Sequence, residues 1–279
     1  MDPACRLEGT PFLDTHIWLT QCRPIIGMIH LLALPGAPLW KGSLQEVLDR
    51  ACADGRTLLD AGFDAVLVEN YGDLPFTAGA VDPSTVAAMT WILAHFQQAV
   101  DIPLGINVLR NDWRSALALA CVCGGRFIRV NVHCGVTVTD QGIITGQAHD
   151  CLRMRRSLDA THIGIFADVW VKHGLPLGHE TEIVESGREI LCRGLADALI
   201  VTGRATGAPI QLDHLTLLRR AFPDAALIAG SGVNQDNVET VAPVADAAIV
   251  GTGIKRDGVT TNPVNRSQAE HLVKLWKRC

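Results

Sequence analysis

Two short apolar runs near the C-terminus decide the fold: Ala-Leu-Ile-Ala-Gly-Ser-Gly (residues 226–232) and Ala-Ile-Val-Gly-Thr-Gly (residues 248–253). Each run ends in a pair of glycines, and about one short helix of chain separates them. Glycine lets the main chain approach an anion closely, and the loops after strands seven and eight of a (β/α)₈ barrel often build a phosphate site. If these runs are strands seven and eight, six strand–helix units must precede them.

Six such units do precede them. The expected strands are residues 25–31, 64–70, 103–109, 126–132, 162–169 and 198–202. The helical patterns that follow them are residues 43–62, 83–100, 112–123, a segment ending at 158, 180–193 and 212–221. Ser43 with Glu46 forms a capping box at the first helix. A last helix over 264–277 completes the alternation.

Strict strand–helix alternation in this number predicts an α/β protein with a closed (β/α)₈ TIM barrel. An open doubly wound sheet is the alternative, but the glycine-ended first strand of a Rossmann fold is missing. Residues 136–145 alternate around Asp-Gln-Gly and predict a β-hairpin inserted after strand four. We expect residues 1–23 to be an irregular N-terminal arm and residues 24–279 to be one barrel domain.

Composition excludes several classes of protein. Of the 279 residues, 48% are hydrophobic and 19% charged, as in soluble globular proteins. The net charge of −5 gives no reason to expect a nucleic-acid partner. No apolar run approaches the ~20 residues that span a bilayer, and the N-terminal residues do not resemble a secretory signal. We therefore expect a cytoplasmic protein.

The nine cysteines do not predict a metal site. Cys121 and Cys123 form the closest pair, but no second pair completes a zinc site. An odd number of cysteines within helical patterns indicates small buried side chains in a reducing compartment. No H-E-x-x-H spacing occurs, and nothing in the sequence indicates an organic cofactor. His30, Glu69 and Asp168 could still converge on a divalent metal ion.

Polar side chains gather at the carboxyl ends of the predicted strands. Along strand four, Ile128, Val130 and Val132 share the parity expected to face the helices, whereas Phe127, Arg129, Asn131 and His133 share the inward parity. Buried charges need partners. The other polar residues at the same end are His30, Glu69, Asn70, Asn107, Arg110, Asn111, Asp168 and Lys172. Active sites of such barrels lie at this end. The alternative is a structural ion pair of Arg129 with Glu69 or Asp168.

Within this ring we assign Glu69, Asp168, Lys172, Arg129 and His30 to catalysis, and Asn70, Asn107, Arg110, Asn131 and Thr202 to substrate binding. A buried lysine can form a Schiff base, bind phosphate or pair with a carboxylate, and Lys172 could also be a solvated loop residue. His30 could be a general base or a core histidine.

The phosphate-binding residues are predicted to be Gly203, Gly230, Ser231, Gly232, Gly251 and Thr252, with Lys255 as a nearby cation. Thr202-Gly203 and Thr206-Gly207 could form a third wall. The alternative is that the glycines only permit tight turns between strands and helices.

Many ordered segments resemble the BtpA/SgcQ family. They include Gly-Met-Ile-His-Leu (27–31), Val-Glu-Asn-Tyr-Gly-Asp-Leu-Pro-Phe (68–76), Asn-Val-Leu-Arg-Asn-Asp (107–112), Phe-Ile-Arg-Val-Asn-Val (127–132), Thr-Asp-Gln-Gly-Ile-Ile (139–144) and Ala-Asp-Val-Trp-Val-Lys-His (167–173). The resemblance runs from about residue 24 to the C-terminus. One departure is His133-Cys134, where a Leu-Thr type of pair is expected.

The resemblance implies a ribulose-phosphate-binding type of barrel and a named role in photosystem I biogenesis or stability. It implies no particular reaction. Our first hypothesis is an enzyme that acts on a small phosphorylated sugar or nucleoside-like compound by lyase, aldolase or isomerase chemistry. The rival is a non-catalytic assembly or stability factor for a membrane complex, which requires an exposed apolar patch. Trp18, Trp40, Trp113 and Trp276 are candidates for that patch, although they could equally be core residues. A third hypothesis is a barrel that has lost catalysis and senses a phosphorylated metabolite. The chain could also form a homo-oligomer.

Overall fold

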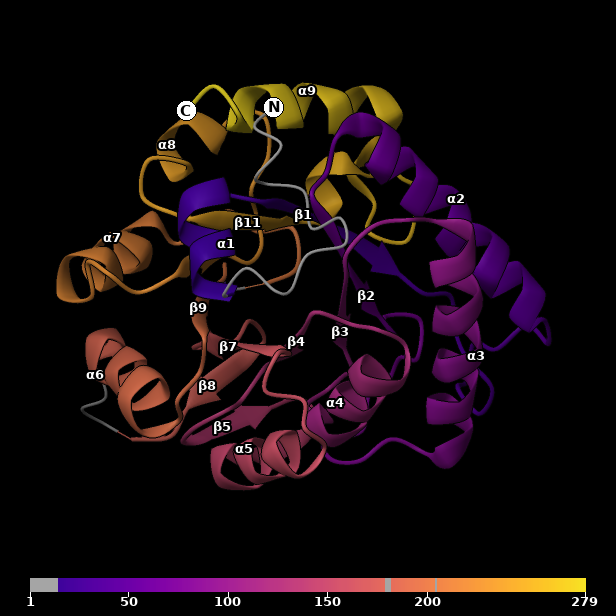
Figure 1. Cartoon of the computed structure of the whole chain (residues 1–279), viewed down its shortest axis with the longest axis horizontal. Coiled ribbons are helices and arrows are strands. Elements are labelled where there is room, and N and C mark those ends of the chain that lie inside the picture. Colours follow the sequence, from indigo (N-terminus) through magenta and orange to yellow (C-terminus); the bar gives the residue numbers. More distant parts are fainter. Residues whose placement is uncertain (1–14, 179–181, 204) are drawn as a thin grey trace.

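The computed structural model describes residues 15–178, 182–203 and 205–279, and these form a closed barrel of parallel strands surrounded by helices (Figure 1). The order of strands around the barrel is β1-β11-β10-β9-β7-β4-β3-β2, and every neighbouring pair is parallel. The strands are β1 Ile25–His30, β2 Ala65–Glu69, β3 Leu104–Asn107, β4 Phe127–Val130, β7 Gly164–Val169, β9 Ala198–Val201, β10 Leu227–Ala229 and β11 Ala247–Val250. The predicted TIM barrel is therefore confirmed, and the open sheet is excluded.

The outer layer follows the predicted helices closely. It contains α2 Leu44–Ala61, α3 Pro83–Ala99, α4 Trp113–Val122, α5 Ala148–Ser157, α6 Ile183–Arg188, α7 Leu212–Ala221, α8 Val238–Val241 and α9 Arg266–Trp276. A π-helical turn, η2 Glu189–Arg193, continues α6, and two 3₁₀ turns, η3 Thr252–Ile254 and η4 Arg256–Gly258, follow β11. Residues 180 and 181 of the predicted fifth helix lie outside the described residues. No helix of the described segments is long and apolar enough to cross a bilayer.

The ends of α2 show how local sequence sets a helix. The Ser43 hydroxyl accepts a hydrogen bond from the Glu46 N–H at 3.1 Å, which is the predicted cap. Gly62 ends the helix with a φ of 89°, a left-handed conformation that favours glycine. Between these caps, one face of α2 is buried against the barrel.

The predicted hairpin after β4 is confirmed as β5 Val136–Thr139 and β6 Gly142–Thr145. A third strand that the sequence did not reveal, β8 Gly174–Pro176, pairs with β5 and extends it to a three-stranded sheet. At three residues, β8 is too short to show an alternating pattern.

Residues 15–22 are not irregular, as we had expected, but form the helix α1 Thr15–Cys22. Its Trp18 and Leu19 are buried in the cluster of side chains that fills the barrel interior, and Trp18 lies 6.0 Å from Phe127 between ring centroids. Figure 1, a view along the barrel, shows α1 lying across the strands inside the ring of helices. The apolar interior would otherwise be open to water at this end, which explains why a short helix is stable here. Residues 1–14 of the predicted arm lie outside the described residues.

Large and small side chains alternate within the barrel interior. Phe127 and Phe166 stack with ring centroids 4.6 Å apart. The space for Phe127 comes from Gly105 on the neighbouring strand, because a Cβ atom at Gly105 would lie 2.0 Å from the Phe127 ring. The apolar layer at this level therefore depends on the absence of a side chain at residue 105.

Replacing Gly105 with alanine should lower the free energy of unfolding by about 1–3 kcal/mol, because the added methyl group overpacks the Phe127 layer. Gly79→Ala is the matched control, since a Cβ atom at Gly79 meets nothing within 4 Å. Urea unfolding followed by circular dichroism measures both changes. Equal stability of the two variants would contradict this packing account.

Candidate functional site

A buried ion pair lies at the carboxyl end of the barrel. The Arg129 guanidinium donates to both carboxylate oxygens of Asp168 through Nε and NH2, each at 3.1 Å. Asn131 Nδ2 donates to the same carboxylate at 2.7 Å. Burial alone would lower the pKa of Arg129, but the charges of Asp168 and Glu69 raise it above its ordinary value. The structural alternative from the sequence, a pair between Arg129 and Asp168, is thus present.

Asparagines extend this pair into a network that joins the loops. Asn107 Nδ2 donates to the Arg129 carbonyl oxygen at 3.1 Å and to Asn131 Oδ1 at 3.2 Å. Asn70 Oδ1 accepts from the Leu109 N–H at 2.7 Å, so Asn70 ties the second loop to the third. The Arg110 guanidinium donates to the Lys172 carbonyl oxygen. These residues hold the mouth in one arrangement.

Glu69 and Lys172 differ from this network because no hydrogen bond or ion pair joins their charged groups to another side chain of the described residues. Glu69 is buried, yet within the described residues its carboxylate accepts no hydrogen bond and forms no ion pair. The Lys172 ammonium is likewise without a hydrogen-bond acceptor in that part of the chain. Burial lowers the pKa of Lys172, and the Glu69 charge opposes this shift. An oppositely charged pair is therefore left facing the mouth.

His30 ends β1 with its ring packed on Tyr71, at 4.8 Å between ring centroids. Its Cε1 would lie 3.1 Å from a Cβ atom at Gly251, so the ring lies beside the predicted phosphate loop. Burial lowers the pKa of His30 well below its ordinary value, and the charges of Lys255 and Lys172 add to the shift. His30 is therefore neutral at pH 7 and can donate with one ring nitrogen and accept with the other.

Several buried polar atoms of the predicted site have no partner among the described residues. They are His30 Nδ1, Asn107 Oδ1, Arg110 Nε and Thr202 Oγ1. Buried polar atoms in proteins are almost always hydrogen-bonded, since an unsatisfied one costs about 1–3 kcal/mol. Four such atoms therefore belong to residues of the mouth, and three others, on His133, Gln141 and Gln268, lie elsewhere in the described chain.

The glycine-rich loops after β9, β10 and β11 pack tightly on one another. The Gly203 N–H donates to Ser231 Oγ at 2.9 Å. Gly232 has a φ of 71°, and a Cβ atom there would lie 2.2 Å from the Ala208 carbonyl oxygen. Close packing thus explains part of the glycine content, as the alternative reading of these loops expected.

The same loops also present free backbone donors. Across the part of the chain that the structure describes, the N–H groups of Gly232, Val233 and Thr252 donate to no acceptor. These groups follow β10 and β11, as do the backbone donors of the phosphate sites known in barrels of this kind. The Thr252 hydroxyl lies 2.9 Å from the Thr260 hydroxyl. The loops can therefore offer an anion several N–H groups.

Two predicted contributors to the mouth lie elsewhere. Lys255 is buried and donates to Asp54 on α2 at 2.9 Å, so its ammonium is committed to a structural ion pair and not to a phosphate. His133 does not point into the barrel, because β4 ends at Val130 and the alternation does not continue to residue 133. Its Nε2 lies 2.8 Å from the Gly194 carbonyl oxygen, next to η2.

The hypothesis that His30, Glu69 and Asp168 converge on a divalent ion finds no support in their arrangement. Within the described residues, no three His, Cys, Asp or Glu side chains are grouped so that they could hold a metal ion. The Asp168 carboxylate is instead occupied by Arg129 and Asn131.

The sequence reading missed the part that Tyr71 takes in the mouth, and it listed Asn111 at this end without giving it a role. Burial and Glu69 raise the pKa of Tyr71, whose hydroxyl lies beside those of Thr206 and Thr260 from two other loops. Asn111 bonds both the N–H and the carbonyl oxygen of Val132, at 2.8 and 3.0 Å. Tyr71 is the only tyrosine in the chain and directly follows Glu69-Asn70, which was an available signal.

Comparison with known proteins shows which family the chain belongs to. Residues 21–278 match the model of the BtpA family. An uncharacterised protein of Thermococcus kodakarensis is 45% identical over 255 residues, which cover 91% of this chain and 95% of that protein. The photosystem I biogenesis protein BtpA of Synechocystis is 45% identical over 235 residues, 84% of this chain and 81% of that protein.

Among solved structures, N-(5'-phosphoribosyl)anthranilate isomerase from Pyrococcus furiosus superimposes with a TM-score of 0.54 at 13% identity. The superposition covers 92% of this chain and all of that one. At this identity the likeness shows the shared TIM-barrel fold alone.

The neutral state of His30 predicts a pH dependence of stability. An unfolded histidine has a pKa of about 6.5, and the pKa of His30 in the folded protein lies well below this value. The unfolded state therefore binds more protons as the pH falls below about 6.5, and stability decreases there. His30→Gln should flatten this decrease between pH 7 and 5, although His133 and His173 retain shifts of the same sign.

Urea unfolding at a series of pH values measures the effect. Stability curves of wild type and His30→Gln that run parallel between pH 7 and 5 would contradict a buried neutral His30. His149→Gln, at an exposed position on α5, is the control substitution.

Proposed function

Since the chain belongs to the BtpA family, we propose that it is an enzyme acting on a small phosphorylated sugar or nucleoside-like compound. The reaction class is lyase, aldolase or isomerase chemistry. The carrying observation is that Glu69 and Lys172, whose charged groups form no hydrogen bond or ion pair with another described side chain, share one mouth with backbone N–H groups that donate to no described acceptor on the loops after β10 and β11. The name of the Pyrococcus isomerase, whose substrate carries a phosphate, agrees with this proposal.

The phosphate of the substrate would be held by the loops containing Gly203, Gly230–Gly232 and Gly251–Thr252. Backbone N–H groups suit a phosphate because they supply partial positive charge without a side chain that must be ordered. Thr202, whose buried hydroxyl lacks a partner within the described chain, would donate to the adjacent part of the substrate.

Glu69 would move the proton. A general base must have its carboxylate free to reach the substrate, and Asp168 is engaged by Arg129 and Asn131. We therefore assign Asp168, Arg129 and Asn131 to positioning, and Lys172 to stabilising an enolate or oxyanion. The lowered pKa of Lys172 is also compatible with a Schiff base to a carbonyl substrate.

Replacing Thr252 with glutamate should weaken binding of ribose 5-phosphate about 100-fold or more, because a carboxylate would enter the anion site. Isothermal titration calorimetry measures the affinity, and the ligand-induced rise in melting temperature gives a second readout. Thr240→Glu, on the exposed surface of α8, makes the same charge change and should leave binding intact. Tight binding to both variants would place the phosphate elsewhere.

Glu69→Gln should slow exchange of the carbon-bound proton next to the carbonyl of ribulose 5-phosphate by about 10²- to 10⁴-fold, the usual contribution of a general base. Proton NMR in D₂O follows the exchange directly and does not require the product to be known. Glu239→Gln, on the surface of α8, is the control. If exchange persists in Glu69→Gln, a group other than Glu69 is the general base.

The rival role as an assembly factor has one observation in its favour. Ile143, Val138 and Leu175 lie side by side across β6, β5 and β8, and all three are exposed. The relative from Synechocystis bears the name of a photosystem I biogenesis protein. Of the four tryptophans that we considered for such a patch, Trp18, Trp113 and Trp276 are buried, and Trp40 is half-buried in the loop before α2, away from this sheet. Failure of every phosphorylated compound to bind would favour this role.

A further inference from the structure

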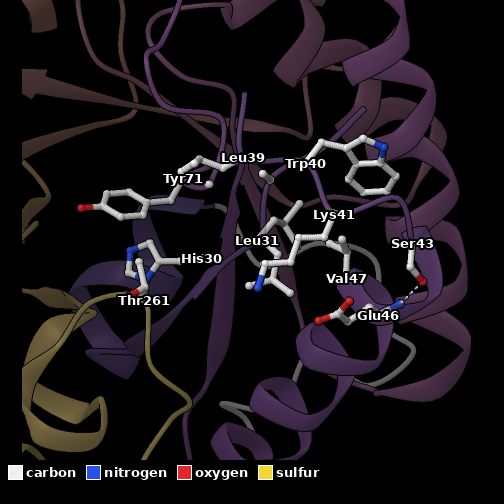
Figure 2. Close-up of a pocket in the computed structure, with 13 residues that line it drawn as sticks. His30, Leu31, Leu39, Trp40, Lys41, Ser43, Glu46, Val47, Tyr71 and Thr261 are labelled. Carbon is white, nitrogen blue, oxygen red and sulfur yellow. Dashed lines mark hydrogen bonds between the residues drawn. The ribbon is translucent and has the colours of Figure 1, made fainter. Parts of the chain in front are cut away.

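A cavity of about 170 Å³ lies beside the mouth, between the first loop after β1 and the start of α2 (Figure 2). Most of its wall is apolar and comes from Leu31, Leu39, Trp40 and Val47. Figure 2 shows His30 and Tyr71 on one side of it and Trp40 on the other.

Two large apolar side chains in the cavity wall are exposed to solvent to an unusual degree. Leu39 is 62% exposed, and Trp40 is only half-buried, although both line the cavity. Apolar surface that stays in water at a concave site is typical of a place where a ligand binds. A ligand in the cavity would cover both side chains.

One polar atom in the wall has no partner. His30 is 9% exposed, and its Nδ1 has no hydrogen-bond partner in the described part of the chain. The same ring lies next to Gly251 of the phosphate loop and packs on Tyr71. His30 and Tyr71 therefore form a wall that the cavity shares with the mouth, and one molecule could reach both.

We propose that this cavity binds a single aromatic heterocycle, which is the non-phosphorylated end of the substrate. The inference rests on the proposed function, because it places the phosphate of the same molecule on the loops after β10 and β11. An apolar cavity of ~150 Å³ is enough to hold benzene, so the present volume is sufficient for one ring of pyrimidine size.

The polar groups around the cavity fit such a ring. A planar ring with both hydrogen-bond donors and acceptors can satisfy neutral His30 through either tautomer. Lys41 and Glu46, which are exposed and also line the cavity, provide one donor and one acceptor of opposite charge for substituents of the ring. Trp40 offers an aromatic surface, and aromatic pairs are favourable beyond the area that they bury.

The test compares uridine 5'-monophosphate, uridine and ribose 5-phosphate by isothermal titration calorimetry. Wild type should bind uridine 5'-monophosphate at least about tenfold more tightly than ribose 5-phosphate, since only the former fills the cavity. The double variant Leu39→Ala/Trp40→Ala should remove this difference and leave the affinity for ribose 5-phosphate unchanged. Leu217→Ala/Trp91→Ala, a pair of similar exposure on α7 and α3, is the control.

The outcomes separate this inference from the proposed function. Equal affinities of wild type for the two phosphates, or equal losses of both in the Leu39/Trp40 variant, would overturn the cavity assignment and leave the phosphate site standing. Binding of uridine 5'-monophosphate that survives Thr252→Glu but is lost in the Leu39/Trp40 variant would overturn the phosphate site and keep the cavity. Failure of wild type to bind either uridine compound would also overturn the cavity assignment.

Discussion

The bidentate ion pair between Arg129 and Asp168 is the interaction on which the mouth of the barrel depends. Two charges buried among apolar strands are tolerated only when each is paired and hydrogen-bonded, and removal of one partner of such a pair typically costs about 3–5 kcal/mol. Here the pair joins β4 to β7, and Asn131 and Asn107 supply further hydrogen bonds. The guanidinium of Arg129 is therefore hydrogen-bonded by Asp168, whereas Glu69 stabilises it only through its nearby charge.

The proposed chemistry depends on which charged groups are paired and which are not. Because Asp168 satisfies Arg129, Glu69 and Lys172 keep their charged groups free of other described side chains. Facing them, the loops after β9, β10 and β11 use glycine both to pack closely and to present backbone N–H groups. Both uses occur at residues 231 and 232. The Ser231 hydroxyl accepts from the Gly203 N–H, while the Gly232 N–H donates to no acceptor among the described residues. A polar mouth whose N–H donors and Glu69 carboxylate have no hydrogen-bond partner among the described residues suits proton transfer on a phosphorylated substrate.

The barrel itself could be predicted from the sequence because its strands are buried on both faces. Each therefore appears as a continuous apolar run, and parity along strand four correctly placed Phe127, Arg129 and Asn131 inward. The same alternation wrongly predicted that His133 points inward, because β4 ends at Val130. The helix α1 was missed because its stability comes from the contact of Trp18 and Leu19 with the barrel interior, not from a helical pattern of its own.

The sequence also predicted several of the residues that lie at the carboxyl end of the barrel, but neither all of them nor how they pair. Lys255 and Asp54 are 201 residues apart, and no spacing rule links them. The choice between Glu69 and Asp168 as partner of Arg129 was likewise decided by three-dimensional geometry. Tyr71 was missed because its contacts with Thr206 and Thr260 join three loops that are distant in the chain. Composition and periodicity report burial, whereas these contacts depend on the closure of the barrel.

The central claim is that a phosphate ester binds at this mouth through backbone N–H groups. The most direct measurement is a crystal structure of the protein with ribose 5-phosphate. The account predicts the phosphate within about 3 Å of the N–H groups of Gly232, Val233 and Thr252, with the sugar directed toward Glu69 and Lys172. A phosphate bound away from these three groups, or a mouth that stays free of ligand at saturating concentration, would contradict it.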